Sequence, residues 1–359
     1  MSISPPRSSG AASPPPRPPE QRSEAEDRWV SFQPYLLSKG YQLRPRYQPD
    51  WVPSWTITGD NPFDCEDSAD SIPLRTLDAM RLADKRQVVI KMIIPSKLDR
   101  EGEEELQIIQ HFSSPPHSDN PSNHAVPCLD SFPIPGMEDS MFYVMPLLSE
   151  YMEPPFCSLS DIHDFLVQVI EGLEFLHKNG VAHCDIASAN IMMDASPLYD
   201  EPFHPFYQHR SLDGKRLILP KYLRSQRPVR YYYIDFGYAK WFRDPNTPRS
   251  LVGTLAREPA PEQMDGAAYD PFIADIFQLG AVLRRDVIPS RINPISPSSC
   301  SRDDQHRSWQ TTDIKLGTPN NQHPLLRDPR LENSMAVRSP GHADRTAMYT
   351  VFDWGFGGG

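Results

Sequence analysis

The sequence predicts an α+β protein in which strands come first and helices follow. Residues 73–94 and 125–148 each have the pattern of a β-hairpin, with short apolar runs on either side of a polar turn. Residues 159–179 carry the clearest helical pattern, in which apolar residues recur at i, i+3 and i+4: Ile162, Phe165, Leu166, Val169, Ile170, Leu173 and Leu176. Runs of strands followed by runs of helices are typical of the α+β class.

The two ends of the chain lack such patterns. Residues 1–28 are rich in Pro, Ser and Arg, and we expect them to be disordered. Residues 29–72 are first aromatic and then acidic without a regular period, which predicts an extended lead-in followed by a loop. Residues 289–359 have few apolar residues and no sustained period, so we expect a poorly ordered C-terminal tail.

The elements of the first half have recognisable ends. The first hairpin is expected to turn at residues 83–86. A helix over residues 101–112 begins with acidic residues, where the helix dipole favours them. Prolines that follow break this helix, and the second hairpin is expected to turn at residues 135–139.

The helices of the second half also carry end signals. The long helix is expected to start after Ser158 or Ser160 and to end at Gly180. A further helix opens at Asp270-Pro271, a cap followed by a proline in the first turn. It is expected to place four apolar residues on one face: Phe272, Ile276, Leu279 and Leu283.

Composition excludes several classes of function. The chain has 359 residues and a net charge of −11, and an acidic chain is a poor partner for nucleic acid or an anionic membrane. It holds no apolar run of the roughly 18–20 residues that span a bilayer, and no apolar signal core at its N-terminus. Its 5 Cys are scattered without metal-binding spacing. These observations predict an intracellular protein, cytoplasmic or nuclear, that binds neither nucleic acid nor membrane.

Two charged residues in the first half are candidates for a phosphate site. Lys91 ends the β-branched strand VVIK, and a Lys on a rigid strand can reach a phosphate as a point charge. An edge lysine of a sheet is the alternative interpretation. Glu105, on the following helix, can pair with Lys91 and hold it, or it can be one of several acids on a solvated first turn.

Two short motifs in the second half carry groups suited to catalysis. In the loop HCDIASAN, Asp185 can accept a hydroxyl proton, and Asn190 can offer its carbonyl oxygen to a hard cation. In Asp235-Phe236-Gly237, the Asp follows the strand YYYI and the Gly lets the chain turn, which is a metal-anchoring arrangement. Each motif alone is short enough to arise by chance.

In this order, these stretches resemble the protein-kinase superfamily. VVIK is similar to the family's V-A-I-K, HCDIASAN to its H-R-D-L-x-x-x-N, and D-F-G is intact. Ala260-Pro261-Glu262 resembles A-P-E, and DIFQLG from Asp275 resembles the D-x-W-x-x-G of the family's αF helix. The element Trp51–Trp55 is similar to a lead-in of fungal-type kinase-like proteins. The resemblance covers about residues 73–288.

The resemblance implies a bilobal fold with ATP and Mg²⁺ in the cleft between the lobes. The small, β-rich N-lobe would span residues 73–148, and the mainly helical C-lobe would span residues 149–288 and be truncated after αF. Met145 would be the gatekeeper, and residues 146–148 would be the hinge. The adenine would lie against four residues: Val89, Met145, Leu147 and Met192.

The resemblance also implies a role for each polar residue of the motifs. Lys91 would contact the α- and β-phosphates and pair with Glu105. Asp185 would orient the acceptor hydroxyl as the catalytic base, while Asn190 and Asp235 would hold the metal.

Some features depart from the family's pattern. No glycine occurs between Gly59 and Gly102, so the glycine-rich loop is missing, and a hairpin around residues 74–82 is expected to cover the nucleotide. The residues Ala187, Ser188 and Ala189 stand where the family carries a Lys or Arg near the γ-phosphate, and Cys184 replaces the Arg of H-R-D.

An insert at residues 196–230 also separates the two catalytic motifs. It is rich in Lys and Arg, and we expect a solvated surface excursion, with a docking surface for an acidic partner as the alternative.

Two functions agree with this pattern. The first is an ATP-dependent protein kinase that phosphorylates Ser or Thr of a protein substrate. The alternative is a catalytically impaired pseudokinase, a scaffold that binds partners through its lobes or through PPPRPP at residues 14–19, which suits a reader of Pro-rich motifs. A small-molecule kinase is a third candidate.

Overall fold

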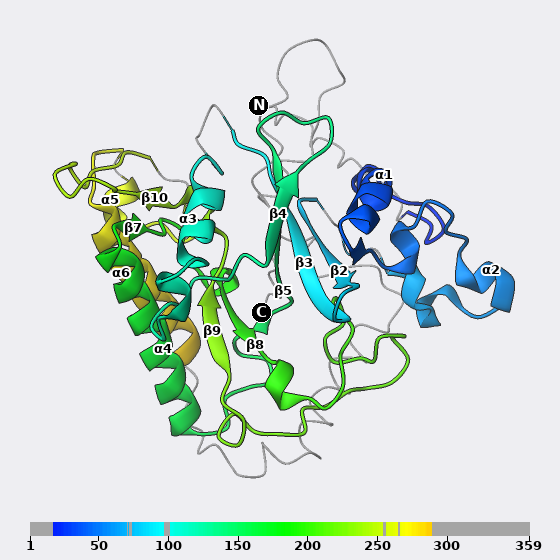
Figure 1. Ribbon diagram of the computed structural model, residues 1–359. Coiled ribbons are helices and arrows are strands. Elements are labelled where there is room, and N and C mark those ends of the chain that lie inside the picture. The colour runs from blue at the N-terminus through cyan, green and yellow to red at the C-terminus, as the bar shows by residue number, and fades with distance from the viewer. Residues whose placement is uncertain are drawn as a thin grey trace, which may run out of the picture.

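A five-stranded antiparallel sheet forms the first half of the fold (Figure 1). In the computed structural model, which describes residues 17–69, 71, 74–96, 101–253, 256–264 and 266–288, the strands lie in the order β1-β2-β3-β5-β4. Their bounds are Tyr41–Gln42 (β1), Thr76–Arg81 (β2), Arg86–Ile93 (β3), Asp130–Pro133 (β4) and Met141–Pro146 (β5). Both predicted hairpins, β2–β3 and β4–β5, are confirmed.

Two helices pack on opposite faces of this sheet, α1 (Glu24–Ser38) and α3 (Glu105–Phe112). Side chains alternate between the faces along a strand, so Val88 and Ile90 of β3 pack in the α1 cluster, and Val89 and Ile93 pack in the α3 cluster. Lys91 lies between Val89 and Ile93 in this alternation and therefore faces α3.

Helix α1 shows that the expectation of disorder up to residue 28, followed by an extended lead-in, is wrong for the residues described. A capping box starts the helix, because Ser23 accepts a hydrogen bond from the Glu26 amide and Glu26 accepts one from the Ser23 amide. Trp29 is fully buried, with its ring 5.9 Å from that of Phe142. The helical period is hard to see in the sequence because two of the buried positions, Glu26 and Gln33, are polar.

The connection from β1 to β2 is also folded, where a loop was expected. Residues 43–69 of this connection, which we call the β1–β2 module, contain helix α2 (Ser54–Thr58) and three 3₁₀ turns. Arg46 joins the module to α1: it forms an ion pair with Glu26, and these side chains are 1% and 0% exposed. The Arg46 guanidinium also donates to the backbone carbonyls of Pro19, Gln21 and Asp67. This buried charge lies beside a few buried apolar side chains of the module, such as Leu43 and Tyr47, and it interrupts any apolar period in the segment.

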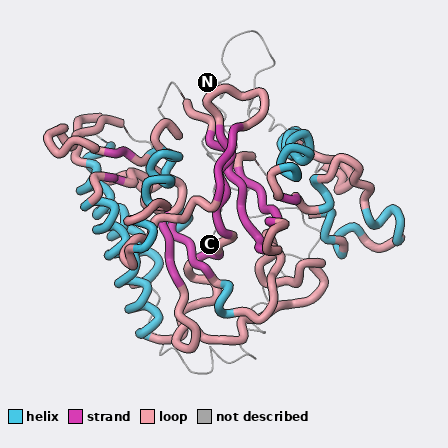
Figure 2. Tube along the Cα trace, in the orientation of Figure 1, coloured by secondary structure: helices cyan, strands magenta, loops and turns pink. Residues whose placement is uncertain are grey.

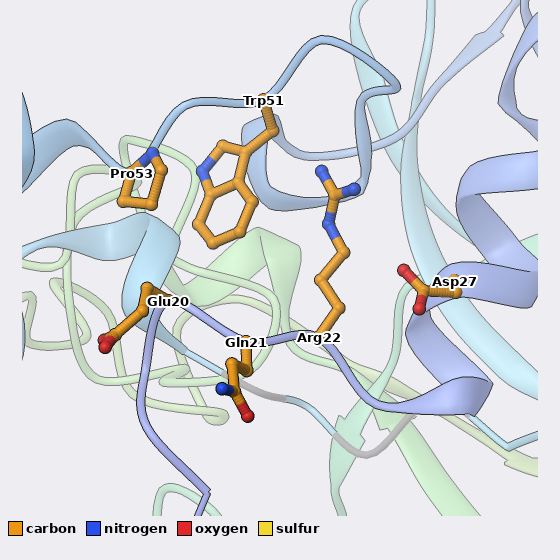
Figure 3. A pocket seen from close by; sticks show the side chains of 6 residues that line it. All are labelled: Glu20, Gln21, Arg22, Asp27, Trp51 and Pro53. Carbon is orange, nitrogen blue, oxygen red and sulfur yellow. The ribbon is translucent and has the colours of Figure 1, made fainter.

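Trp51 is the aromatic centre of the β1–β2 module (Figure 3). The guanidinium carbons of Arg22 and Arg46 lie 4.8 and 4.9 Å from the centroid of its ring, and its indole N–H donates to Asp67 at 2.8 Å. A hollow of about 420 Å³ opens beside it, lined by Glu20, Gln21, Arg22, Asp27, Trp51 and Pro53. These contacts fix the chain before α1 onto the module.

The second half is mainly helical, which completes the bilobal α+β arrangement (Figure 2). Its helices are α4 (Leu159–Lys178), α5 (Pro261–Met264) and α6 (Pro271–Val282), the last followed by a π-helical turn over Leu283–Val287. One small sheet joins β6 (Ser149–Glu150), β8 (Ile191–Asp194) and β9 (Arg230–Tyr233), and another joins β7 (Val181–Ala182) and β10 (Lys240–Trp241). Among the described residues, no helix is long and apolar enough to cross a membrane.

Helix α4 follows the sequence prediction closely. Ser158 is its N-cap, which decides between the two serines considered, and Gly180 follows its C-cap with φ +74°. Phe165, Val169, Leu173 and Leu176 are buried as its periodicity predicts, whereas Ile170 is exposed.

Gly180 gives a stability prediction with a matched control. A Cβ at this position would lie 2.5 Å from the Phe242 carbonyl oxygen, whereas at Gly40, with φ +89°, it would meet nothing within 4 Å. Both Gly→Ala changes carry a left-handed backbone cost of about 1–2 kcal/mol. We expect Gly180→Ala to cost about 1–3 kcal/mol more than Gly40→Ala because of crowding. Denaturant unfolding measures both, and equal costs would contradict the close approach.

Helix α6 differs from the prediction at its buried face. Phe272 and Leu279 are buried as expected, but Ile276 is 60% exposed. The inner face instead carries Asp275 and Gln278, both fully buried, because these polar side chains bind the backbone of the loop after β7. The predicted tail at residues 289–359 lies outside the described residues, as do residues 14–16, the first half of PPPRPP.

The insert at residues 196–230 is packed onto the fold at His204 and Arg224, so its interpretation as a solvated excursion is wrong for these residues, whereas residues such as Arg216 and Lys221 are exposed as expected. Arg224 is buried and donates to the Tyr231 hydroxyl at 2.6 Å and to the Tyr151 carbonyl at 2.9 Å. His204, also buried, hydrogen-bonds Glu66 of the β1–β2 module at 3.1 Å. The insert thus joins the two halves of the molecule.

Candidate active site

Strand β3, helix α3 and the segment after β9 bring three charged side chains together. Lys91 Nζ lies 2.6 Å from Glu105 Oε1 and 2.6 Å from Asp235 Oδ1. The side chains of Lys91 and Glu105 are 12% and 3% exposed, and that of Asp235 is 34% exposed. Lys91 stands on a central strand, paired on both sides by β2 and β5, so it is not an edge lysine.

These three groups shift one another's protonation. Burial alone would lower the pKa of Lys91, but the carboxylates of Asp235 and Glu105 outweigh it and raise that pKa. Burial opposes the ionisation of Asp235, yet Lys91 and Arg257 outweigh it and lower the pKa of Asp235 to about 2. Burial raises the pKa of Glu105, although Lys91 opposes that shift. Lys91 is therefore cationic and Asp235 anionic at neutral pH.

The backbone at Asp235 is bent sharply after β9. Its φ of 61° and ψ of 68° lie in the left-handed region, which costs a non-glycine residue about 1–2 kcal/mol and is often found at functional sites. The next side chain, Phe236, is fully buried with its ring 4.9 Å from His183, and the Gly237 carbonyl accepts from the Gly102 amide at 2.8 Å. These contacts hold the bend that sets Asp235 beside Lys91.

Asp185 and Asn190 lie on the loop between β7 and β8. The Asn190 amide donates to Asp185 Oδ2 at 3.0 Å and to the Asp185 carbonyl at 2.7 Å. Both residues are almost fully buried. The other carboxylate oxygen, Asp185 Oδ1, accepts a hydrogen bond from the backbone amide of Arg257 at 2.7 Å.

Side chains of helix α6 bind the backbone of this loop. Asp275 accepts hydrogen bonds from the amides of His183 at 2.8 Å and Cys184 at 2.7 Å, and Gln278 accepts from the Ile186 amide at 2.9 Å. A buried carboxylate that satisfies two backbone donors fixes a loop strongly, because losing it would leave both donors unpaired. The side chain of Asp275 therefore positions Asp185.

Arg257 is the residue of this site that sequence reasoning missed. Its guanidinium lies 3.3 Å from Asn190 Oδ1, 3.4 Å from Asp235 Oδ2 and 3.6 Å from Asp185 Oδ2. The only signal in the sequence is its position three residues before Ala260-Pro261-Glu262. Nothing local marks it as part of a site, because its contacts depend on how the chain returns to the loop between β7 and β8.

Comparison with known proteins now decides the family. The protein kinase domain matches residues 75–321, more than half of the chain. The chain belongs to the protein kinase family. It is also similar to a probable serine/threonine-protein kinase, KKQ8, of Saccharomyces cerevisiae strain YJM789, with 24% identity over 197 residues that cover 53% of this chain and 21% of the relative. The protein of that name from strain ATCC 204508 / S288c is 25% identical over 123 residues, 33% of this chain and 13% of the relative. The chain thus matches about a fifth or less of the length of these relatives.

In this kinase fold, the side chains expected around the adenine are brought together. Val89 pairs with Met145 across β3 and β5, and both belong to the cluster that contains Met192, with Leu147 packed against it. The insert reaches the same place, because Gln208 donates to the Leu148 carbonyl at 3.0 Å and Gln87 of β3 donates to the Phe203 carbonyl at 2.9 Å. The insert therefore contacts Leu148, where the resemblance implies the hinge.

The structure around residues 74–82, where the glycine-rich loop is missing, differs from the hairpin that the sequence predicts. Strand β2 lies beside β3 as predicted, but its partner β1 is reached through the β1–β2 module, so these two strands are not joined by a tight turn. Arg44 fixes the module to the sheet: its guanidinium lies 2.8 Å from Asp78 of β2 and 2.8 Å from Glu66. Since Glu66 also binds His204, the module and the insert are joined at one carboxylate.

The donor set of the kinase site fits magnesium. Mg²⁺ binds one or two carboxylates and leaves its other positions to phosphate and water, so it needs few protein ligands. Asn190 Oδ1 and Asp235 Oδ2 supply oxygen, and both already face a cationic group, the Arg257 guanidinium, at 3.3 and 3.4 Å. Among the described residues, no group of three or more His, Cys, Asp or Glu suited to a metal occurs.

Proposed function

We propose that the protein is an ATP-dependent kinase that transfers the γ-phosphate to a Ser or Thr hydroxyl of a protein substrate. The observation that carries this proposal is that Lys91 lies 2.6 Å from both Glu105 and Asp235. It requires three separate elements to meet, and a surface lysine would not be held by two carboxylates. The names of the matched relatives, probable serine/threonine-protein kinases, favour a protein acceptor.

Each polar residue has a role in this reaction. Lys91 would hold the α- and β-phosphates, with Glu105 fixing its position, and Asn190 and Asp235 would hold Mg²⁺. Magnesium neutralises phosphate charge when it is bound. Asp185 would accept the proton of the acceptor hydroxyl, and its carboxylate is oriented by Asn190 and by the Arg257 amide. Positioning and charge neutralisation supply most of the catalysis in such reactions.

The pseudokinase scaffold is the second candidate, and one contact favours it. Gln208 of the insert donates to the carbonyl of Leu148 in the hinge, where the adenine of ATP would approach. A nucleotide that entered there would compete with this contact. The missing glycine-rich loop favours the same alternative, because fewer backbone amides would cover the phosphates.

Stabilisation by nucleotide tests the proposal. We expect saturating Mg-ATP, at about 100 times its Kd, to stabilise the wild-type chain by about 2.7 kcal/mol, and Lys91→Ala to lose most of this effect. Lys91→Arg keeps a cation beside Glu105 and Asp235, so it is the variant to measure if Lys91→Ala does not fold. Lys178→Ala, at an exposed ion pair on α4, is the control that should keep the full effect. A wild-type chain that Mg-ATP does not stabilise would overturn the proposed function.

A further inference from the structure

Arg257 brings a positive charge into the centre of the catalytic site from outside the catalytic loop. It lies between β10 and α5, and its guanidinium is within 3.3–3.6 Å of oxygens of Asn190, Asp235 and Asp185. Its side chain is 29% exposed, so a ligand that enters from solvent can reach it.

The catalytic loop itself offers no cation at the corresponding place. Ala187 is 3% exposed and has no polar side-chain atom, and the Ser188 hydroxyl is bonded to Asp286 and Arg285. Phosphate transfer spreads negative charge over the oxygens of the moving group, and a site without a cation there loses much of its catalytic power. The loop therefore carries no cation of its own. Arg285, which contacts Ser188, is already paired with Glu258 and Asp286, whereas Arg257 is a cation that another segment brings to Asp185, Asn190 and Asp235.

The backbone around Arg257 is held firmly, although the contacts of its guanidinium with the three catalytic residues are long. The adjacent Glu258 forms an ion pair with Arg285 at 2.6 Å, and the Ala260 amide donates to Gln263 at 2.7 Å. The three guanidinium contacts of 3.3–3.6 Å are longer than the 2.7–2.9 Å typical of a charge-assisted hydrogen bond. Phosphate oxygens can therefore compete with these contacts.

We propose that Arg257 is the phosphate-binding cation of this catalytic centre and contacts the terminal phosphate of a nucleoside triphosphate. This inference rests on the proposed function. In the transfer step, the bond between the γ-phosphorus and the bridging oxygen breaks, and a bond forms from the acceptor oxygen to that phosphorus. The acceptor proton passes to Asp185, and the nucleoside diphosphate leaves. Arg257 stays protonated throughout and neutralises charge, for which its planar donor pair suits two phosphate oxygens.

Relocating the charge provides the sharpest test. We expect Arg257→Ala to lower kcat by about 10²–10³-fold, as the loss of a single charge-stabilising donor does elsewhere. Adding Ala187→Lys to Arg257→Ala should restore at least tenfold of that loss, because it returns a cation to the catalytic loop. Arg249→Ala is the matched control, since Arg249 lies in the same segment but packs over Phe272 at 4.5 Å.

A binding measurement separates a phosphate contact from a structural role. The wild-type chain should be stabilised more by Mg-ATP than by Mg-ADP, and Arg257→Ala should lose this preference. Without nucleotide, the free energy of unfolding of Arg257→Ala should stay close to that of Arg249→Ala. An unchanged kcat, a raised kcat or an unchanged preference for ATP in Arg257→Ala would overturn the inference while leaving the proposed kinase function intact. A wild-type chain that binds no nucleotide would overturn both.

Discussion

Asp185→Asn is expected to lower the rate of phosphate transfer by about 10²–10⁴-fold, the range that a general base contributes. The variant should still fold, because the Asn oxygen can accept the hydrogen bond that Asp185 Oδ1 now accepts from the Arg257 amide at 2.7 Å. The Asn190 amide loses its bond to Oδ2 but keeps the one to the backbone carbonyl of residue 185 at 2.7 Å. It should still bind Mg-ATP, since Lys91 and Asp235 are unchanged. The measurement is kcat, with thermal stabilisation by Mg-ATP recorded on the same protein.

The matched control for this variant is Asp164→Asn. Asp164 lies on α4 with its side chain 64% exposed, so the same chemical change there should leave kcat within twofold. If Asp185→Asn kept the wild-type rate, Asp185 would not be the base. If it lost nucleotide binding as well as rate, the change would have disturbed the site and not the proton transfer alone.

Arg46→Met is expected to destabilise the fold by about 3–5 kcal/mol, the cost of removing one partner of a buried ion pair. Arg46 and Glu26 are 1% and 0% exposed, and without Arg46 the buried Glu26 carboxylate would lose its nearest cation. The same change would remove the guanidinium donor from the carbonyls of Pro19, Gln21 and Asp67. Denaturant unfolding measures the free-energy difference.

An exposed ion pair provides the comparison for Arg46. Arg216 lies 2.6 Å from Glu201 with the two side chains 60% and 46% exposed, so Arg216→Met should cost at most about 1 kcal/mol. Equal costs for Arg46→Met and Arg216→Met would contradict a stabilising role for the β1–β2 module, because the buried pair would then contribute no more than a surface pair.

The residues of the catalytic motifs could be predicted because their signals are local. Alternation along β3 places Lys91 on one face of the sheet, and the helical period after Ser158 places a loop with Asp185 and Asn190 at the end of α4. The order of the motifs along the chain then indicated a shared site. Distances follow from the fold and not from the spacing. The pairing of Lys91 with Glu105 was expected, whereas the contact of Lys91 with Asp235 is visible only in the structure, and both distances are 2.6 Å.

The features that sequence reasoning missed depend on buried charge and on distant contacts. Helix α1 and the β1–β2 module pack around Glu26 and Arg46, and charged residues at buried positions erase the apolar period that predicts a helix. Arg224 looked solvated because charged residues usually are, yet it is buried beside Tyr231. Arg257 acts through three residues that lie 22 to 72 positions away in the chain. Such roles become visible only when the folded backbone brings these segments together.

Transfer of labelled γ-phosphate from Mg-ATP to protein acceptors tests the proposed kinase activity most directly. We predict Mg²⁺-dependent incorporation into Ser or Thr by the wild-type chain, reduced by about 10²–10⁴-fold in Asp185→Asn at equal nucleotide occupancy. Wild-type protein that binds Mg-ATP and transfers no phosphate above the level of Asp185→Asn would contradict this activity.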